Sequence, residues 1–262
     1  MHNGNVRVSN TNPAQLDAEW PSYEFRHPSK ADAYYLVNKP LVDLLRSTIA
    51  DLNGREAISV VDLGCGSKPY FPLFASKARK YIGIDRQPHS MCDMASVAES
   101  IAIKSNAFDV VMCTQVLEHV EDPARVLREC YRVCKPGGSL LLSTHGVFVY
   151  HPGPQDYWRW THTGLRKIVT EAGAFDEIQV IPSGGTFSCF FGLAAHYLNL
   201  WLRQPPRWGW RMKCVLLKNS CNYVLNYLGE KLDIRFPQRP GAPHSLIPNY
   251  LVVAKKSRHE LS

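Results

Sequence analysis

Four short apolar runs, separated by segments with helical spacing, constrain the fold of this chain more than any other feature. The runs are Ile58–Leu63, Tyr81–Ile84, Phe108–Cys113 and Ser139–Thr144. Apolar runs of this length predict buried strands, and helical segments between consecutive strands predict parallel crossover connections. The sequence therefore predicts an α/β fold with a doubly wound, mostly parallel sheet.

Further elements flank these strands and divide the chain. Apolar spacing predicts a helix over Ala31–Leu52, and Asp122 with Pro123 predicts the start of a helix that runs to Cys134. The Lys135–Gly138 segment is typical of a turn, and a further helix and two strands are expected at Thr163–Ala172, Glu177–Ile181 and Tyr250–Ala254. We expect residues 1–30 to form a loose arm and residues 31–182 and 249–256 to form the core. Residues 183–248 then form a helical, basic insertion before the last strand.

A glycine pair follows the first predicted strand. Gly64 and Gly66 lie where a buried strand turns towards a helix, and Asp85 ends the next strand 21 residues after Gly64. Glycines at this point let a ligand approach the backbone, and an acidic side chain after the next strand can bind both hydroxyls of a ribose. The fingerprint for NAD requires a small residue where this chain has Pro69. The spacing therefore favours a cofactor without a pyrophosphate, such as S-adenosylmethionine.

Four motifs in order carry a resemblance to a known family. They are Asp62-Leu-Gly-Cys-Gly66, Gly83-Ile-Asp85, the segment 108–120, and Leu140-Leu-Leu-Ser-Thr144 after Lys135-Pro-Gly-Gly138. Together they resemble class I S-adenosylmethionine-dependent methyltransferases, above all the ubiquinone and menaquinone biosynthesis methyltransferases. The resemblance covers about residues 55–182. It implies a Rossmann-like sheet of seven strands whose last strand runs antiparallel.

The resemblance also implies which residues bind S-adenosylmethionine. Asp62 would orient the methionine amine, Asp85 would hold the ribose, and the segment at Ala98 would border the adenine. This chain departs from the family at Lys68, where many members have a third glycine, and at Val97, where many have an aspartate. The full implied cofactor set is Asp62, Gly64, Cys65, Gly66, Asp85, Ala98, Glu99, Thr114 and Gln115.

Methyl transfer to an oxygen or nitrogen requires that the acceptor lose a proton, which calls for a base such as histidine. From His119, His145, His151, Asp156 and Tyr157, all near strand ends, we select His119, His151 and Asp156 as catalytic candidates. The alternative for His119 is that it caps a helix and packs its ring. A Glu-x-x-Glu-His motif binds a divalent metal in ubiquinone O-methyltransferases. Here Gln115 replaces its first glutamate, and we expect no metal site.

The segment His151–Thr161 mixes aromatic, basic and acidic side chains in a loop shaped by proline and glycine. It resembles a segment of methyltransferases from polysaccharide and lipid-linked glycan gene clusters, and loops of this kind often bind substrate. We expect Tyr157, Trp158 and Arg159 to contact the acceptor. The alternative is that Trp158 and Trp160 close the core as an aromatic plug.

The insertion contains sixteen residues, Phe187–Leu202, with no formal charge. As a helix this stretch would be about 24 Å long, which is too short to span a membrane. Gly192, His196 and Asn199 would form a polar stripe on it, continued by Arg203. A second amphipathic stretch would place Leu217, Cys221, Val224, Leu228 and Leu232 on one face.

Tryptophans and basic residues accompany the apolar stretch. Residues 186–262 hold 11 Lys/Arg and 3 Asp/Glu, whereas residues 1–185 hold 19 and 20. These features predict an interfacial anchor on an anionic membrane surface. The alternatives are a cap over the substrate pocket and an interface of a homo-oligomer, and nucleic-acid binding is not expected. The tryptophans and basic residues that accompany the apolar stretch are Trp201, Arg203, Arg207, Trp208, Trp210, Arg211 and Lys213.

The function predicted from these features is S-adenosylmethionine-dependent O-methylation of an amphiphilic or lipid-linked acceptor, either a glycan or an isoprenoid. A cytoplasmic location, peripheral on the inner face of a membrane, is expected because the eight cysteines are scattered and MHNGNVRVSN contains no apolar signal region. Two alternatives remain. One is a small-molecule O- or N-methyltransferase with the insertion as a lid, and the other is a non-catalytic cofactor-binding subunit.

Overall fold

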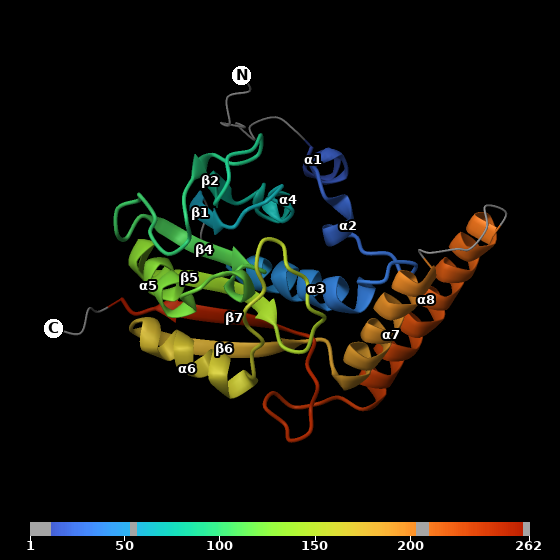
Figure 1. The fold of residues 1–262 in the computed structure, drawn as a ribbon. Coiled ribbons are helices and arrows are strands. Elements are labelled where there is room, and N and C mark those ends of the chain that lie inside the picture. Colours follow the sequence, from blue (N-terminus) through green and yellow to red (C-terminus); the bar gives the residue numbers. More distant parts are fainter. Residues whose placement is uncertain (1–11, 53–56, 203–209, 259–262) are drawn as a thin grey trace.

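The computed structural model describes residues 12–52, 57–202 and 210–258, and for residues 210–216 only the backbone. Figure 1 shows one sheet between two layers of helices, with a helical hairpin extending away from it. The strand order is β3-β2-β1-β4-β5-β7-β6, and β7 is antiparallel to β5 and β6 while the other pairs are parallel. The strands are β1 (Ile58–Leu63), β2 (Ala78–Asp85), β3 (Met94–Ala95), β4 (Phe108–Thr114), β5 (Cys134–His145), β6 (Phe175–Ser183) and β7 (Asn249–Lys256).

Two apolar cores form because β1, β4 and β5 are covered on both faces. One face packs on α5 (Pro123–Val133) and α6 (His162–Ala172), and the other packs on α3 (Tyr35–Asp51) with α4 (Phe71–Phe74). The N-cap prediction for α5 is confirmed, since the Asp122 carboxylate accepts a hydrogen bond from Arg125 N. The predicted seven-stranded α/β fold with an antiparallel last strand is confirmed, and all the parallel strands end at one edge of the sheet.

The Lys135–Gly138 segment differs from its prediction as a turn. The structure places it inside β5, which begins directly after α5 at Cys134. The pairing with β4 shifts between Phe108 and Val110, so extra residues of β5 bulge out of the ladder. Gly137 has a φ of +73°, a conformation that favours glycine. The glycines thus form a bulge in the strand.

The N-terminal segment also differs from its prediction as a loose arm, within its described part. Residues 13–26 form two short helices, α1 (Pro13–Glu19) and α2 (Tyr23–Arg26). The Arg26 guanidinium is completely buried and donates to the Asp17 carboxylate and to several backbone carbonyls, among them Pro69 O. A buried arginine that is fully hydrogen-bonded fixes the segment to the core.

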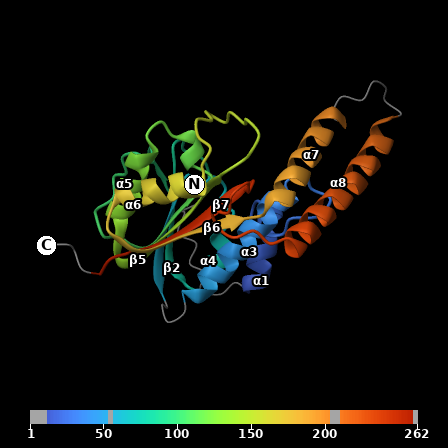
Figure 2. The same cartoon turned by 90° about the horizontal axis from the view of Figure 1, so that it is seen from below.

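The insertion forms a hairpin of two long helices, α7 (Thr186–Leu202) and α8 (Trp210–Arg235). Figures 1 and 2 show the two helices side by side, projecting beyond the sheet next to the beginning of α3. The Asp233 carboxylate of α8 accepts hydrogen bonds from the backbone nitrogens of Gly185, Phe187 and Ser188. The start of α7 is therefore capped by its partner helix.

Candidate functional site

The predicted cofactor loop connects β1 to α4 at the carboxyl edge of the sheet. Gly64 and Gly66 have φ angles of +66° and +46°, which other residues adopt at a cost. The Gly66 N–H donates to Asp85 Oδ2 at 2.9 Å, so the loop and the end of β2 are in direct contact. A side chain at Gly66 would meet no atom within 4 Å, so space is open beside this backbone. The loop thus offers bare backbone next to a carboxylate.

Asp62 is the last but one residue of β1, two residues before Gly64, and it is buried. Its Oδ2 accepts a hydrogen bond from Tyr81 Oη at 2.7 Å, while its buried Oδ1 has no hydrogen-bond partner among the described residues. Burial raises the pKa of the Asp62 carboxyl to about 7. An unpaired buried carboxylate oxygen is costly, and a ligand ammonium group would remove that cost. The arrangement fits the amine of a bound amino acid moiety.

Lys68 occupies the third-glycine position without closing the loop. Its backbone is left-handed, with a φ of +53°, and its buried ammonium group forms a 2.6 Å ion pair with Asp93. Its side chain crosses directly over Gly83 of β2, where a side chain would clash with it. Asp93 also accepts a hydrogen bond from Gly83 N. Asp93 was not predicted as part of the site, because no sequence motif relates it to Lys68.

The N-terminal helices cover the outer side of the loop. Trp20 Nε1 donates to Lys68 O at 2.9 Å, and the hydroxyls of Ser22 and Ser67 are 2.6 Å apart. With the Arg26–Pro69 hydrogen bond, these contacts hold the loop from outside the core. These contacts of the N-terminal helices were not predicted, because an Asn- and Pro-rich segment lacks the periodicity that reveals an amphipathic helix.

The remaining predicted cofactor residues lie along the same edge. Ala98 and Glu99 form a turn after β3, and Glu99 O accepts a hydrogen bond from Arg125 Nε. Thr114 ends β4. The Gln115 amide donates to Ser143 Oγ at 2.9 Å and to Asn249 Oδ1 at 3.2 Å, so it is held by β5 and β7.

Three histidines and a glutamate gather beyond the ends of β4 and β5. Glu118 lies in η1 (Leu117–His119), His145 ends β5, and His151 follows in the next loop. The imidazole of His151 is perpendicular to those of His119 and His145, with ring centres 5.0 and 5.1 Å apart. Glu118 is completely buried and accepts a hydrogen bond from Thr144 Oγ1 at 2.9 Å. Burial raises the pKa of Glu118 and lowers that of His145 to about 3.

Asp156 and Arg159, both predicted to act on the acceptor, bind each other in the structure. The Arg159 guanidinium donates to both carboxylate oxygens of Asp156 at 2.6 and 2.7 Å, and also to the carbonyls of Phe148 and Val149. These hydrogen bonds from Arg159 hold the pKa of the Asp156 carboxyl well below its usual range. A carboxylate this acidic is a poor base. The Asp156–Arg159 ion pair instead stabilises the conformation of the loop to which both residues belong.

Tyr157 and Trp158 connect this loop to η1. Tyr157 N donates to Glu118 O at 2.8 Å, and Trp158 Nε1 donates to Val120 O at 2.8 Å. Trp158 also stacks on Trp160 at 6.0 Å. His119 Nδ1 lies against Gln155 O in the same loop. The loop therefore forms the wall of the histidine cluster, with the Tyr157 ring partly exposed at its surface.

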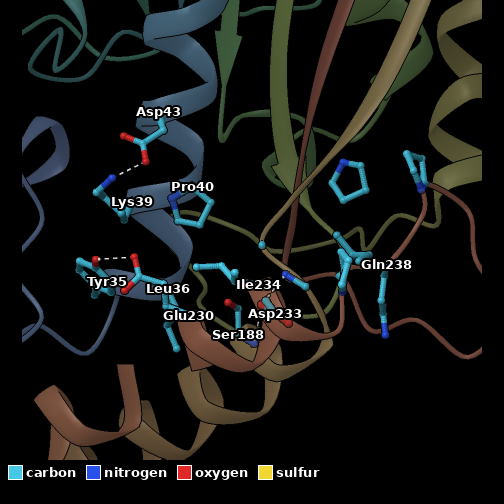
Figure 3. A pocket seen from close by; sticks show the side chains of 16 residues that line it. Tyr35, Leu36, Lys39, Pro40, Asp43, Ser188, Glu230, Asp233, Ile234 and Gln238 are labelled. Carbon is cyan, nitrogen blue, oxygen red and sulfur yellow. Dashed lines mark hydrogen bonds and ion pairs between the residues drawn. The ribbon is translucent and has the colours of Figure 1, made fainter. Parts of the chain in front are cut away.

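A separate cavity of about 420 Å³ lies at the base of the hairpin, between α3, α7 and α8 (Figure 3). Its charged groups have partners: Lys39 pairs with Asp43, Glu230 accepts a hydrogen bond from Tyr35 Oη, and Asp233 accepts hydrogen bonds from backbone nitrogens at the start of α7. Within the described chain, none of the residues lining it belongs to the predicted cofactor set or to the histidine cluster.

Comparisons with known proteins agree with this geometry. Residues 61–142 match a family model described as a methyltransferase domain. A ubiquinone biosynthesis O-methyltransferase of Pseudomonas paraeruginosa is 34% identical over 124 residues, which cover 40% of this chain and 53% of that protein. The match thus spans about half the length of this curated relative.

Two solved structures share the fold at low identity. A methyltransferase from Archaeoglobus fulgidus described as SAM-dependent superposes with a TM-score of 0.50 at 17% identity, covering 86% of this chain and all of that one. The (4+2)-cyclase SpnF superposes with a TM-score of 0.52 at 19% identity, covering 83% and 82%. The strand order and the glycine loop are those of the fold shared with these structures, and residues 61–142 are similar to a methyltransferase domain. The cyclase shows that this fold alone does not define the reaction.

Proposed function

We propose that this protein transfers a methyl group from S-adenosylmethionine to a hydroxyl of an amphiphilic or lipid-linked acceptor at a membrane surface. The methyltransferase step is supported by the glycine loop with Asp62 and Asp85. The choice of acceptor is supported by the hairpin, whose apolar side chains point outwards. Glycan and isoprenoid acceptors both fit this chemistry.

The cofactor residues proposed here fit their ligand by their own contacts. The open backbone at Gly66 and the carboxylate of Asp85 would hold the ribose, and Asp62 would hold the methionine ammonium group. Val97, an exposed apolar residue, and the turn at Ala98 would border the adenine. Bound S-adenosylmethionine supplies an electrophilic methyl group on a sulfonium.

The neighbouring histidine cluster would accept the acceptor's proton. His119 and His151 are partly exposed and in contact with each other, and His151 itself belongs to the loop 146–160. His145 is buried behind them and stacks on Phe148 at 4.0 Å. A histidine base close to the cofactor's methyl end suits deprotonation of a hydroxyl. Asp156, which is bound by Arg159, would position the loop.

The hairpin buries two asparagines between its helices. Asn199 of α7 and Asn222 of α8 meet in the seam between the two helices, and both are buried. Asn199 Nδ2 donates to Asn222 Oδ1 at 2.8 Å. Hydrogen-bonded asparagines between helices are typical of helices packed in lipid, where apolar residues gain nothing by facing each other.

Large apolar side chains are exposed on the outer surface of the hairpin, together with polar ones such as Asn219 and Lys231 of α8. Trp201 at the far end of α7 is 74% exposed, and Phe190 and Tyr197 on the same helix are 57% and 61% exposed. On α8, the Leu217 and Val224 side chains of the predicted apolar face are also exposed. An exposed apolar surface of this kind marks a contact with a membrane or a partner. Since α7 carries no Asp, Glu, Lys or Arg, an apolar medium suits it best.

In the described part of the chain, no helix is long and apolar enough to cross a bilayer. The proposed attachment is therefore interfacial. The structure gives no side-chain positions for four basic residues that were expected to contact the membrane. Arg203 and Arg207 lie outside the described residues, and the side chains of Arg211 and Lys213 are not described. The charge excess of residues 186–262 supports an anionic surface.

The deciding experiment measures transfer of a labelled methyl group from S-adenosylmethionine to two panels of acceptors. One panel contains lipid-linked glycans and isoprenoid phenols in anionic vesicles, and the other contains the same head groups without lipid. We expect turnover of the lipid-linked panel. Turnover confined to the free head groups would support the lid alternative, and cofactor binding without any turnover would support the non-catalytic alternative.

A further inference from the structure

Three side chains of the histidine cluster have the composition and spacing of a metal-ligand set. They are Glu118, His145 and His151. One oxygen of the carboxylate and one nitrogen of each imidazole lie within 4.8 Å of one another. The three residues come from different elements at the carboxyl edge of the sheet, so the fold itself brings them together.

Two polar atoms in this cluster lack hydrogen-bond partners. Glu118 Oε1 and His145 Nδ1 are both buried, and neither has a hydrogen bond to any described residue. The nearest ion-pair partner of Glu118 Oε1 is His145 Nε2 at 3.6 Å, which is too far for a hydrogen bond. Each buried polar atom left unsatisfied costs about 1–3 kcal/mol. The unsatisfied Glu118 Oε1 faces His145 Nε2, so an ion bound between these two atoms would satisfy Oε1.

His151 is held with one nitrogen free to bind. Its Nδ1 lies 3.1 Å from the backbone oxygen of Val149. A carbonyl oxygen only accepts hydrogen bonds, so Nδ1 carries the ring proton and Nε2 carries a lone pair. A histidine whose second nitrogen donates to a backbone carbonyl is oriented in the way that metal-binding histidines are.

We propose that Glu118, His145 and His151 bind a divalent transition-metal ion, and that zinc suits this set best. Two imidazoles and one carboxylate form a three-residue zinc set that leaves one coordination position open. Imidazole nitrogens favour transition metals, whereas magnesium and calcium prefer oxygen ligands. The site would thus bind zinc, cobalt(II) or iron(II) in preference to magnesium.

Two other arrangements of nearby ligands are weaker. His119, His151 and Asp156 also lie within 4.8 Å of one another, but both oxygens of Asp156 are bound by Arg159. A set using Gln115 is disfavoured, because its amide is held by Ser143 and Asn249. The proposed site therefore shares only Glu118 with the Glu-x-x-Glu-His motif.

The open position would face the space where the acceptor is proposed to bind. A hydroxyl bound to a divalent metal is more acidic than a free one, so the ion would assist its deprotonation, with His119 in place of the metal-bound His151 as the base. This consequence rests on the proposed function, whereas the metal site itself does not. Metal binding without methyl transfer would contradict the proposed function and leave the proposed metal site standing. Methyl transfer without metal binding would contradict only the proposed metal site.

The test is titration of the full-length, metal-stripped protein with cobalt(II), followed by its visible absorption, and with zinc by calorimetry. We expect one equivalent to bind, with stronger binding of zinc than of magnesium. Replacement of the half-buried ligand, His151→Asn, should weaken binding by about tenfold or more, the effect seen even for residues that only support a metal ligand. Glu118→Gln tests the buried ligand, with circular dichroism as the check that it folds.

Matched controls separate this site from others. His89→Asn and Cys92→Ser remove members of a second group, formed by Cys65, His89 and Cys92, and should leave cobalt(II) binding unchanged. His162→Asn controls for loss of a histidine elsewhere. Absence of stoichiometric binding by the unmodified protein would overturn the proposal. Unchanged binding in His151→Asn, or loss of binding in Cys92→Ser, would do the same.

Discussion

The side-chain amides of Asn199 and Asn222 face each other across the seam of the α7–α8 hairpin, and neither is exposed to solvent. Asn222 also donates to Ala31 O at 2.8 Å, and Asn226 donates to the carbonyls of Lys30 and Asp32. Asparagines thus hold the hairpin together and attach it to the segment before α3.

The first prediction concerns this seam. Asn199→Ala leaves part of the Asn222 amide unpaired in a buried place, so it should lower the free energy of unfolding by about 1–3 kcal/mol. Urea denaturation followed by circular dichroism measures the change. Asn219 is exposed on α8, and Asn219→Ala should change stability by no more than about 0.5 kcal/mol. Equal effects of the two changes would contradict the buried role of Asn199.

The outer face of the hairpin should bind anionic vesicles. Phe190→Ser with Trp201→Ser removes two exposed aromatic side chains, each worth about 1.5–3 kcal/mol when buried in an apolar medium. Co-sedimentation with vesicles should therefore fall strongly, and by a similar amount at low and high salt. Neutralising Arg203, Arg207, Arg211 and Lys213 should instead cost up to about 4 kcal/mol at low salt and much less at high salt.

An exposed aromatic elsewhere provides the control for vesicle binding. Tyr150 lies in the loop after β5 and is as exposed as Trp201. Tyr150→Ser should leave co-sedimentation unchanged. If the unmodified protein stays in the supernatant with anionic vesicles at low salt, the hairpin is a lid or a subunit interface.

Asp85 should determine cofactor affinity. Asp85→Ala removes the carboxylate proposed to bind the ribose and also frees Gly66 N, so S-adenosylmethionine should bind more weakly by about 1.5–3 kcal/mol. Calorimetry measures this difference. Asp176→Ala, an exposed aspartate on β6, is the matched control and should bind the cofactor normally. Undiminished affinity of Asp85→Ala would contradict the ribose site.

Cofactor affinity should depend on pH through Asp62. Its pKa of about 7 means that the carboxyl is increasingly protonated below pH 7, and a neutral carboxyl does not attract the methionine ammonium group. The ammonium group of bound S-adenosylmethionine favours the carboxylate form of Asp62. The pKa of Asp62 therefore falls when the cofactor binds, and protons are released. Affinity should therefore drop about tenfold per unit as pH falls below 7. Calorimetry on either side of pH 7 tests this, and Asp62→Asn should bind weakly with a flat profile.

Asp156 should stabilise the loop after β5 in a pH-dependent way. Because Arg159 holds the pKa of Asp156 below its unfolded value, its stabilisation is complete above about pH 4 and is lost as pH falls further. Asp156→Asn should thus cost about 1–2 kcal/mol near neutral pH, reduced because Arg159 is partly exposed, and little in acid. Thermal unfolding at both pH values measures this. Loss of cofactor affinity in the same variant would contradict a role confined to the loop.

The core of the fold followed from the sequence because its elements carry strong local signals. Ile58–Leu63 is a strand in both prediction and structure, and Asp122 caps α5 as its side chain implies. The second helix of the insertion was located, but its packing was not. Leu217, Val224 and Leu228 are exposed, while Asn222 and Asn226 face the protein. Periodicity shows that a helix has two faces, and it does not show which of them lies in water, protein or lipid.

The site was predicted where residues are close in sequence or follow a motif, and missed where they are not. His119 was identified beside a motif, but the proximity of Glu118 to His145 depends on the parallel pairing of β4 and β5. Asp156 and Arg159 were correctly taken as neighbours on one loop. The ion pair between them uses the charged groups of both residues. It depends on side-chain geometry, which the spacing of residues in the sequence does not specify.

Ser183 and Asn249 pair within the sheet, although residues 184–248 lie between them in the chain. The hairpin therefore leaves the core and returns to it at the same place. Its gain, loss or exchange in evolution would leave the register of β6 on β7 unchanged, since a short turn could join the two strands. The hairpin and the sheet can thus be inherited as separate units, so that one sheet can be combined with different surface contacts.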